Sequence, residues 1–272
     1  LQKVRRLFSA AKGGHTGTLD PMATGLLPLC FGEATKFSAD LLNADKTYEA
    51  VVKFGITTDS GDAEGKVIAT ATVNVAENDI FRVLPQFTGA IQQIPPMHSA
   101  LKRDGRPLYE LARQGIVVER EARAVTIYSL EVLAFTGDTL NLRVSCSKGT
   151  YIRVLASDIG DALGCGGHLT ALRRTEIADL NLTNSVSLAE LEAQDESQRL
   201  ERLQPVDALL LSLPKMMIEG EAAERFSHGN PIERPNELDG KIRVYADGRL
   251  IGVGEPGSDG RLWPKRLVQL AI

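Results

Sequence analysis

The clearest fold signal in this chain is the run AVTIYSLEVLAFTGDTLNLRVSCSKGTYIRVLASDIGDAL, residues 124–163. Two strands are predicted in it, at Ala124–Phe135 and Thr139–Ser147. A helix is predicted over Thr150–Leu163, and Gly164 is a typical residue to end it. The apolar face of this helix consists of Ile152, Leu155, Ile159 and Leu163.

The same patterns predict further elements on both sides of this run. Helices are expected at 1–11, 107–114 and 188–203, and strands at 26–31, 48–54 and 66–75. Near the C-terminus, Asp247-Gly248 lies between apolar segments, as in a β-hairpin turn. Strands are separated by single helices without regular β-α-β alternation. We therefore expect an α+β fold with a mixed, mostly antiparallel sheet and a small β-rich unit at the C-terminal end.

Composition and charge are those of a globular protein. The chain has 272 residues, of which 43% are apolar and 24% charged, and its formal net charge is −4. These values exclude a disordered chain, a coiled coil and a collagen. The sequence has no apolar run of about 18 residues and no recognisable signal peptide. Three scattered cysteines without a CxxC pair predict a reducing cytosol and argue against a zinc site.

A glycine-rich segment, GGHTGTLDP at residues 13–21, is predicted to be a loop that lets the backbone approach a ligand closely. Asp20 lies in this loop, and Pro21 favours an extended backbone before it. The carboxylate of Asp20 could be a nucleophile, a base, or a turn residue that bonds its own backbone, and composition alone favours the turn. A nucleotide-binding loop is not favoured, since neither GxGxxG nor GxxxxGK[ST] occurs.

Two further motifs contain candidate functional residues. DKTYEA, residues 45–50, places Tyr48 near the start of a strand, and CSKGTYIR, residues 146–153, connects a strand to a helix. By themselves, Tyr48 and Tyr151 are typical of half-buried positions with the hydroxyl at the rim of the core. Arg153 lies in the first turn of its helix, where a cation opposes the helix dipole. We therefore expect an anion near it.

The segment HTGTLDPMATGLL, residues 15–27, strongly resembles the signature of the TruB family of tRNA pseudouridine synthases, which isomerise the uridine at position 55 in the T loop of tRNA. The resemblance continues in order through FGEATK (31–36), KTY (46–48), PP (95–96), SALK (99–102), SKGTYIR (147–153) and LRRT (172–175). It covers about residues 1–180, and the C-terminal unit resembles the PUA-type RNA-binding module of that family.

The resemblance implies a domain organisation. A catalytic core is expected at 1–180, with an RNA-clamping insertion at 96–123, then a helical extension at 181–213 and a PUA-like RNA-binding domain at 214–272. The family normally has a strand and a Lys-Pro-x-Gly segment before the helix that begins here near Leu1. We therefore expect this chain to be trimmed at its N-terminus.

The resemblance also implies roles for individual residues. Asp20 corresponds to the essential aspartate, which acts covalently on the base or on the sugar and so divides one difficult step into easier ones. Arg153 corresponds to the partner that keeps Asp20 ionised through a two-bonded contact. Tyr48 corresponds to the residue that stacks on the flipped uridine and is a candidate acceptor for its C5 proton. Tyr151 has a supporting role.

Three more residues are expected to bind the substrate. His15 matches the residue that fills the gap left in the T loop, although a lone loop histidine is more often plain surface. Leu172 matches an apolar residue that lines the uracil pocket, although read alone it is ordinary core. Lys148 is a candidate RNA contact in a basic stretch, residues 141–175, which has five basic and two acidic side chains. The insertion segment 102–123 has six basic and four acidic side chains, and without the resemblance it would be a solvated loop.

Partners and cofactors follow from the chemistry of the implied reaction. Pseudouridine contains the same atoms as uridine, so no ATP, redox cofactor or metal is expected. The expected partner is the T stem-loop of tRNA, without a membrane or a guide RNA, and the protein is expected to act as a monomer in the cytoplasm. Two alternatives stay open: an RNA chaperone that binds and refolds tRNA, and a catalytic subunit of a guide-RNA particle like the dyskerin proteins.

Overall fold

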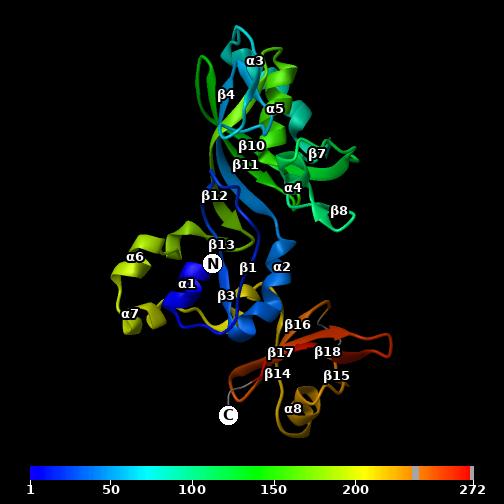
Figure 1. Cartoon of the computed structure of the whole chain (residues 1–272). Helices are drawn as coiled ribbons and strands as arrows, with labels where there is room; N and C mark the ends of the chain where they lie inside the picture. Colours follow the sequence, from blue (N-terminus) through cyan, green and yellow to red (C-terminus); the bar gives the residue numbers. More distant parts are fainter. Residues whose placement is uncertain (235–238, 270–272) are drawn as a thin grey trace. The chain divides into compact units, whose positions relative to one another are not determined.

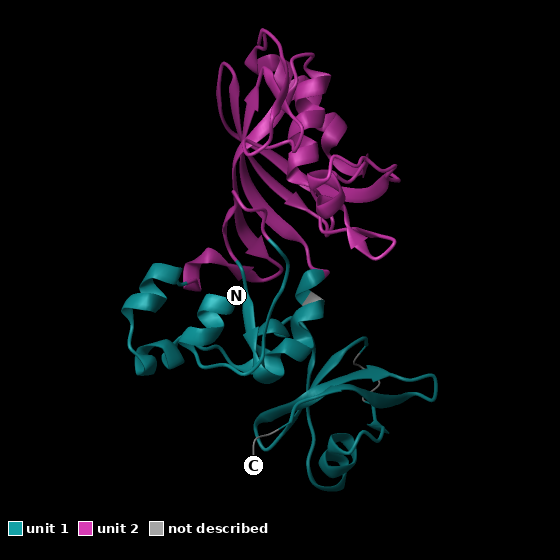
Figure 2. Cartoon of the chain, viewed as in Figure 1, with its two compact units in different colours: residues 1–18, 27–42, 186–272 teal, residues 19–26, 43–185 magenta. Residues whose placement is uncertain are grey.

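The computed structural model describes residues 1–234 and 239–269, and the chain divides into two compact units (Figure 1). Unit 1 comprises residues 1–18, 27–42 and 186–272, and unit 2 comprises residues 19–26 and 43–185 (Figure 2). Each unit is therefore assembled from segments that are distant in sequence. In the described part of the chain, no helix has the length and apolar character needed to cross a membrane.

Unit 2 is built on a seven-stranded sheet with the order β13-β12-β4-β11-β10-β7, in which the short strand β2 lies beside β12. Its strands are β2 Thr24–Gly25, β4 Lys46–Phe54, β7 Gly89–Gln93, β10 Arg123–Thr136, β11 Thr139–Cys146, β12 Gly167–Ile177 and β13 Leu180–Asn181. Neighbours along this order are antiparallel, whereas β2 runs parallel to β12. The predicted α+β class with a mixed, mostly antiparallel sheet is confirmed.

The core of unit 2 lies between this sheet and three helices that pack against it, α3 Glu77–Val83, η2 Leu84–Phe87 and α5 Ile152–Ala162. On β11, buried residues alternate with less buried ones, as expected for a strand with one face against a core. Helix α5 buries the predicted apolar face, including Ile152, Leu155 and Ile159. Burial of these side chains fixes the start of α5 against the sheet, and the candidate site lies at that start.

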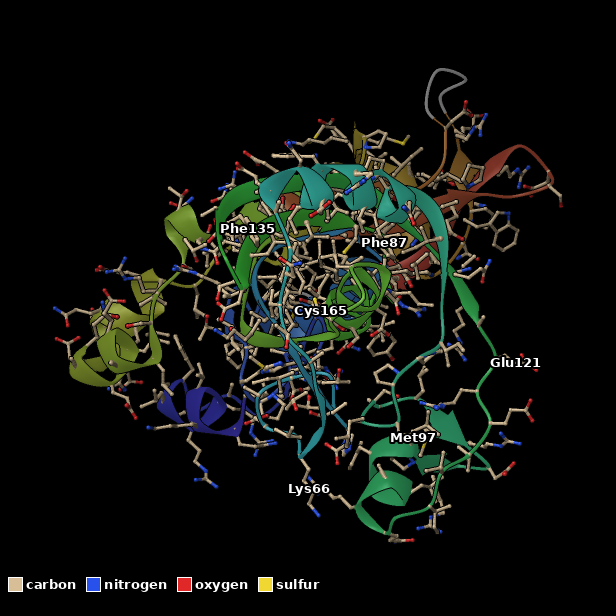
Figure 3. All side chains as sticks on the ribbon, turned by 90° about the horizontal axis from the view of Figure 1, so that it is seen from above. Lys66, Phe87, Met97, Glu121, Phe135 and Cys165 are labelled. Carbon is tan, nitrogen blue, oxygen red and sulfur yellow. The ribbon has the colours of Figure 1, made fainter. Side chains whose placement is uncertain are left out.

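Two connections of unit 2 extend from the sheet. The first contains β5 Ile56–Thr58 and β6 Val67–Thr70, so the strand expected at 66–75 is shorter than predicted. The second, between β7 and β10, contains β8 Lys102–Arg103, β9 Arg106–Pro107 and α4 Leu108–Arg113. Helix α4 confirms the short helix predicted at 107–114. Figure 3 shows Met97 and Glu121 on this second connection, well to one side of Cys165 in the core.

Unit 1 contains a five-stranded sheet of order β14-β16-β17-β18-β15 and several short helices. The sheet comprises β14 Lys215–Met217, β15 Ile232–Glu233, β16 Ile242–Ala246, β17 Arg249–Pro256 and β18 Arg261–Leu267, with α8 Gly220–Ser227 beside it. The other elements are α1 Gln2–Leu7, β1 Gly13–His15, β3 Leu29–Phe31, η1 Gly32–Phe37, α2 Ser38–Leu42, α6 Leu188–Ala193, α7 Glu196–Glu201 and η4 Val206–Leu209. Asp247 and Gly248 have φ angles of 48° and 74°, as the predicted hairpin turn requires.

Four sequence predictions in unit 1 were wrong in detail. The helix expected at 1–11 ends at Leu7, and the strand expected at 26–31 begins at Leu29. The single helix expected at 188–203 is divided into α6 and α7, because Asp195 accepts a hydrogen bond from the backbone of Gln198 and starts a new helix. The segment predicted as a loop at 13–21 begins with β1, which pairs with β3. Its glycines therefore fit a short strand as well as a loop.

Candidate active site

The site is centred on an ion pair between Asp20 and Arg153 in unit 2. Arg153 Nε donates to Asp20 Oδ2 at 2.9 Å, and Arg153 Nη2 donates to Asp20 Oδ1 at 3.1 Å. This two-bonded geometry is the strongest form of a guanidinium–carboxylate contact. The Arg153 side chain is 4% exposed, whereas the Asp20 side chain is 34% exposed. The pair therefore has a buried cation and a carboxylate that a substrate can reach.

Further contacts hold the Arg153 guanidinium in place. Nη1 donates to the Ser60 carbonyl at 3.0 Å, and Nη2 also donates to the His98 carbonyl at 2.8 Å. The Asp62 carboxylate lies 3.6 Å from Nε. Arg153 is the second residue of α5, where the helix dipole disfavours a cation, and the two carboxylates provide the anions that this position needs.

Asp62 also belongs to the site, although no motif in the sequence singles it out. It lies in the turn-rich connection between β5 and β6, and its side chain is buried. Ser60 Oγ donates to Asp62 Oδ1 at 2.6 Å, and the Glu64 backbone donates to the same oxygen at 3.1 Å. The loop is fixed to β12, because the Ala63 backbone donates to the Leu169 carbonyl at 2.8 Å. A turn segment rich in aspartate and serine is so common that its role is visible only in three dimensions.

The loop that carries Asp20 is fixed at both ends of residues 20–26. The Ala23 backbone donates to the Asp20 carbonyl at 2.9 Å, which forms a turn directly after the carboxylate. The Leu26 backbone donates to the Arg174 carbonyl of β12 at 2.8 Å. Gly25 has a φ of +98°, and a Cβ there would lie 2.2 Å from the Arg174 carbonyl oxygen. Only glycine fits at this close approach of loop and strand.

Tyr48 lies on the central strand β4 and is partly buried. Burial raises the pKa of its phenol, and the Asp20 charge acts in the same direction, whereas the Arg174 guanidinium opposes them by its charge and a hydrogen bond. The phenol is therefore neutral at pH 7 and electrostatically coupled to Asp20. The structure thus brings Tyr48 into the neighbourhood of the ion pair.

Tyr151 is held through its backbone at the start of α5. Its N–H donates to Gln93 Oε1 at 2.9 Å, and Gln93 Nε2 donates to its carbonyl at 3.2 Å. Burial raises the pKa of the Tyr151 phenol, and the Arg153 and Asp20 charges act on it in opposite directions. Gln93 was not predicted, and its side chain is buried on the edge strand β7.

The other predicted residues lie in different environments. Leu172 is buried on β12 and belongs to the core of unit 2. Lys148 is exposed in the turn before α5, and its Nζ donates to Asn43 Oδ1 at 2.9 Å. His15 lies on β1 of unit 1, where its Nδ1 accepts a hydrogen bond from the Gly17 backbone at 3.3 Å.

The basic stretch at 141–175 offers less surface charge than its sequence predicts. Arg153 and Arg174 are buried, so they do not contribute to a surface for nucleic acid. Arg143 is exposed but pairs with two glutamates. Lys148 and Arg173 are the exposed cations that remain in this stretch. The charge count of residues 141–175 overestimates the exposed positive charge, because a sequence does not distinguish buried cations from exposed ones.

Among residues 1–234 and 239–269, no group of three or more His, Cys, Asp or Glu side chains is arranged to hold a metal ion.

Comparisons with known proteins match almost the whole chain. Residues 5–152 match the TruB family pseudouridylate synthase N-terminal domain, residues 153–211 the tRNA pseudouridylate synthase B C-terminal domain, and residues 214–268 the pseudouridine synthase II TruB C-terminal domain. The chain is 73% identical over 271 residues to a tRNA pseudouridine synthase B from Dechloromonas aromatica, which covers 100% of this chain and 91% of that protein. It is 57% identical over 268 residues to the tRNA pseudouridine synthase B of Aromatoleum aromaticum, with 98% and 87% covered.

Solved structures with a similar fold include a chain of a Cbf5-Nop10-Gar1 complex. The TM-score is 0.70 at 28% identity, and the match covers 93% of this chain and 72% of that one. A chain of an H/ACA RNP bound to a substrate RNA that contains 2′-deoxyuridine gives a TM-score of 0.71 at 22% identity, with 98% and 79% covered. The second likeness shows the fold alone.

Proposed function

Because the chain belongs to the TruB family of pseudouridine synthases, we propose that Asp20 and Arg153 are its catalytic pair. The chain catalyses the isomerisation of uridine 55 of tRNA to pseudouridine. The observation that supports the choice of catalytic residues is the two-bonded contact between a reachable carboxylate and a buried guanidinium.

The isomerisation breaks the bond from ribose C1′ to uracil N1 and forms a bond from C1′ to C5. The proton on C5 is lost and N1 gains a proton, so atoms and electrons balance within the substrate. A carboxylate that bonds to the base or to the sugar retains the substrate while the uracil turns. Asp20 is our candidate for this nucleophile, since one third of its side chain is exposed.

Arg153 has two tasks in this scheme. It keeps Asp20 ionised, because an opposite charge within bonding distance favours the charged carboxylate. It also sets the direction of the carboxylate, because the Ser60 and His98 carbonyls fix the guanidinium. When Asp20 becomes an ester and loses its charge, Asp62 at 3.6 Å still neutralises the buried cation.

Tyr48 is proposed to stack on the flipped uracil. Flipping a base costs a few kcal/mol, and stacking on an aromatic ring returns roughly 1–3 kcal/mol per base. The Tyr48 hydroxyl is also our candidate acceptor for the C5 proton. Because the phenol is neutral, it releases its own proton to solvent as it takes up the proton from C5, so it acts as a relay. The Asp20 charge acts on the pKa of this phenol, which supports the view that ring and carboxylate serve one substrate.

The remaining site residues are proposed to bind RNA or shape the pocket. Leu172 lines the uracil pocket, Tyr151 supports it, and Lys148 contacts the phosphate backbone. His15 fills the space that the flipped base leaves in the T loop. These roles extend the family resemblance to the corresponding residues of this chain.

The domain roles are proposed in the same way. The core comprises 1–180, the insertion 96–123 clamps the RNA arm, the helical extension is 181–213, and the PUA-like domain, 214–272, adds RNA contacts. The exposed cations of the insertion and the five-stranded sheet with α8 support this assignment. If phosphate contacts dominate, the affinity for tRNA falls steeply with salt.

Replacing Asp20 with Asn tests the catalytic assignment. We expect Asp20→Asn to abolish pseudouridine formation while tRNA binding stays within about twofold. Carbodiimide treatment followed by primer extension locates the product, which has the mass of uridine. Asp179→Asn changes an exposed carboxylate of the same unit and is the matched control. Wild-type turnover by Asp20→Asn would contradict the assignment.

A chaperone activity is compatible with this chemistry, because opening the T loop to flip a base also loosens its tertiary contacts. If the protein is also a chaperone, Asp20→Asn still accelerates refolding of a misfolded tRNA. If it is not, refolding proceeds at the uncatalysed rate with wild-type protein and variant alike.

We propose that this chain acts alone, as a monomer in the cytoplasm, without a guide RNA. Cbf5 and H/ACA proteins share its fold, so the guided mode is the alternative. Incubation of the purified chain with a bare T-arm stem-loop separates the two modes. Product from the stem-loop alone supports stand-alone action, and no product without an added guide RNA would contradict it.

A further inference from the structure

Arg174 is a long cationic side chain in the interior of unit 2, on strand β12. Only 1% of it is exposed, and it ranks first by volume among the fully buried side chains in the described part of the chain. A buried charge is costly unless its hydrogen bonds are satisfied, so its contacts show what it is held for.

On one side, Arg174 fixes the end of the loop that carries Asp20. Its Nε donates to the Leu26 carbonyl at 2.8 Å, and its own carbonyl accepts from the Leu26 backbone N–H at 2.8 Å. Gly25 is its parallel strand partner. Side chain and backbone of one residue thus hold the same loop end, six residues after the proposed nucleophile.

On the other side, Arg174 faces Tyr48 on β4. The two residues are direct partners in the antiparallel register of β12 and β4, so their side chains lie on the same face of the sheet. The Arg174 guanidinium hydrogen-bonds the Tyr48 phenol and opposes the increase in its pKa that burial causes. One guanidinium therefore interacts with both the Tyr48 phenol and the end of the catalytic loop.

We propose that Arg174 is a positioning residue for the isomerisation, which holds the Tyr48 ring in register with the loop that carries Asp20. This inference rests on the proposed function of Asp20 and Tyr48. A stacked base must lie against the ring and beside the carboxylate at the same time, so the relative placement of the two groups determines the reactive geometry. Strand β4 places the ring, the loop places the carboxylate, and Arg174 connects them.

A lysine cannot make the same connection. The planar guanidinium offers five donors in a fixed fork, whereas the ammonium is a point charge on a flexible stem. Arg174→Lys keeps the charge but loses the simultaneous contact with the Leu26 carbonyl and the phenol. We expect the single-turnover rate to fall roughly ten- to hundredfold, because small misplacements of reacting groups have effects of this size. The Kd for tRNA is expected to stay within about twofold.

A double-mutant cycle separates positioning from general stability. Tyr48→Phe keeps the ring and removes the hydroxyl that Arg174 holds. If Arg174 acts through this hydroxyl, Arg174→Lys lowers the single-turnover rate much less in the Tyr48→Phe background than in the wild type. A merely structural role predicts the same factor in both backgrounds, and that result would overturn the proposal.

Matched controls accompany the cycle. Arg82→Lys makes the same substitution at an exposed arginine of α3, and its rate is expected to equal that of the wild type. Thermal melts show which variants fold. If Arg174→Lys does not fold, Gly25→Ala is the substitute. It disturbs the contact between Arg174 and the loop from the loop side, because its new methyl would lie 2.2 Å from the Arg174 carbonyl oxygen. It must show the same non-additivity with Tyr48→Phe.

The Asp20→Asn variant distinguishes a failure of the Arg174 proposal from a failure of the catalytic assignment of Asp20. An unchanged rate for Arg174→Lys together with an inactive Asp20→Asn overturns the positioning role alone. An active Asp20→Asn removes the catalytic assignment, whatever the behaviour of Arg174.

Discussion

Arg153 and Arg143 are ten residues apart in sequence, and each lies beside two carboxylates, yet their environments are opposite. Arg153 is 4% exposed and contacts Asp20 and Asp62, and two backbone carbonyls satisfy its other donors. Arg143 is 45% exposed and pairs with Glu131 at 3.0 Å and with a second glutamate, on β4, at 3.1 Å. The chemical groups are the same, and burial is what differs.

The difference shows why one arginine is suited to catalysis and the other is not. Water and salt screen the pairs of Arg143, and exposed pairs of this kind contribute about 0–1 kcal/mol. The Arg153 guanidinium is shielded from water, so its attraction to Asp20 is screened much less than that of an exposed pair. A shielded cation with every donor engaged can hold a carboxylate in one orientation. An exposed cation moves with its partners.

The largest effect is expected for Arg153→Lys. Lysine keeps the charge but cannot form two parallel bonds to Asp20 while it also reaches the Ser60 and His98 carbonyls. We expect kcat to fall about a hundred- to thousandfold, as when a preorganised donor is removed from an active site. Single-turnover assays on tRNA measure it. Turnover close to wild type would mean that the buried pair is not part of the mechanism.

Asp62→Asn is expected to have an intermediate effect. The substitution keeps an oxygen for the Ser60 hydroxyl and the Glu64 backbone but places an amide where a carboxylate faces Arg153. We expect about a tenfold loss of kcat, since one of the two counter-charges of the buried cation is removed. Asp59→Asn, at an exposed carboxylate of the same loop, is the control. Equal rates for the two variants would restrict the mechanism to Asp20 and Arg153.

The sequence predicted the parts of the fold whose signals are local. The apolar periodicity of α5 and the Asp247-Gly248 turn each lie within a few residues, and both elements are present. Strand β12 was not predicted, although it joins β4 to β2, because Arg173, Arg174 and Glu176 conceal its apolar residues. Arg174 can be buried on this strand because its Nε donates to the Leu26 carbonyl of the loop, a contact that no local pattern in the sequence records.

The site residues also divide into those that the sequence predicted and those that only the fold brings together. The helix dipole at the start of α5 predicts an anion beside Arg153, and the structure places two carboxylates there. The family motif led to Asp20 and Tyr48. Asp62 and Gln93 were missed, because their roles arise from loops and an edge strand that come together only in the fold.

Asp158 lies on helix α5, like Arg153, but the charged group that acts on it is another acid, Asp161. Burial, with a contribution from Asp161, raises the pKa of Asp158 from 3.8 to about 6. The folded state therefore binds a proton that the unfolded state releases between these two pH values, and stability decreases as pH rises through this window. Asp158→Asn is expected to stabilise the protein by ~1 kcal/mol above pH 6, after allowance for its partial exposure. At pH 4 we expect little difference.

Thermal melts of wild type and Asp158→Asn between pH 4 and pH 8 measure this effect. The expected signature is a difference in Tm that grows with pH and levels off above pH 6. A difference that is constant with pH would show that the amide acts through packing rather than through the charge.

The smallest effect is expected for Arg143→Lys, which makes the same substitution as Arg153→Lys in the exposed environment. A lysine can still reach one glutamate at a time, and water solvates whatever charge is left unpaired. We expect a change in stability of less than about 0.5 kcal/mol and a kcat within about twofold of wild type. Denaturant unfolding and single-turnover assays measure the two quantities. A large loss of activity here would break the comparison, because it would mean that charge on the surface of the sheet matters as much for the reaction as the shielded pair beneath it.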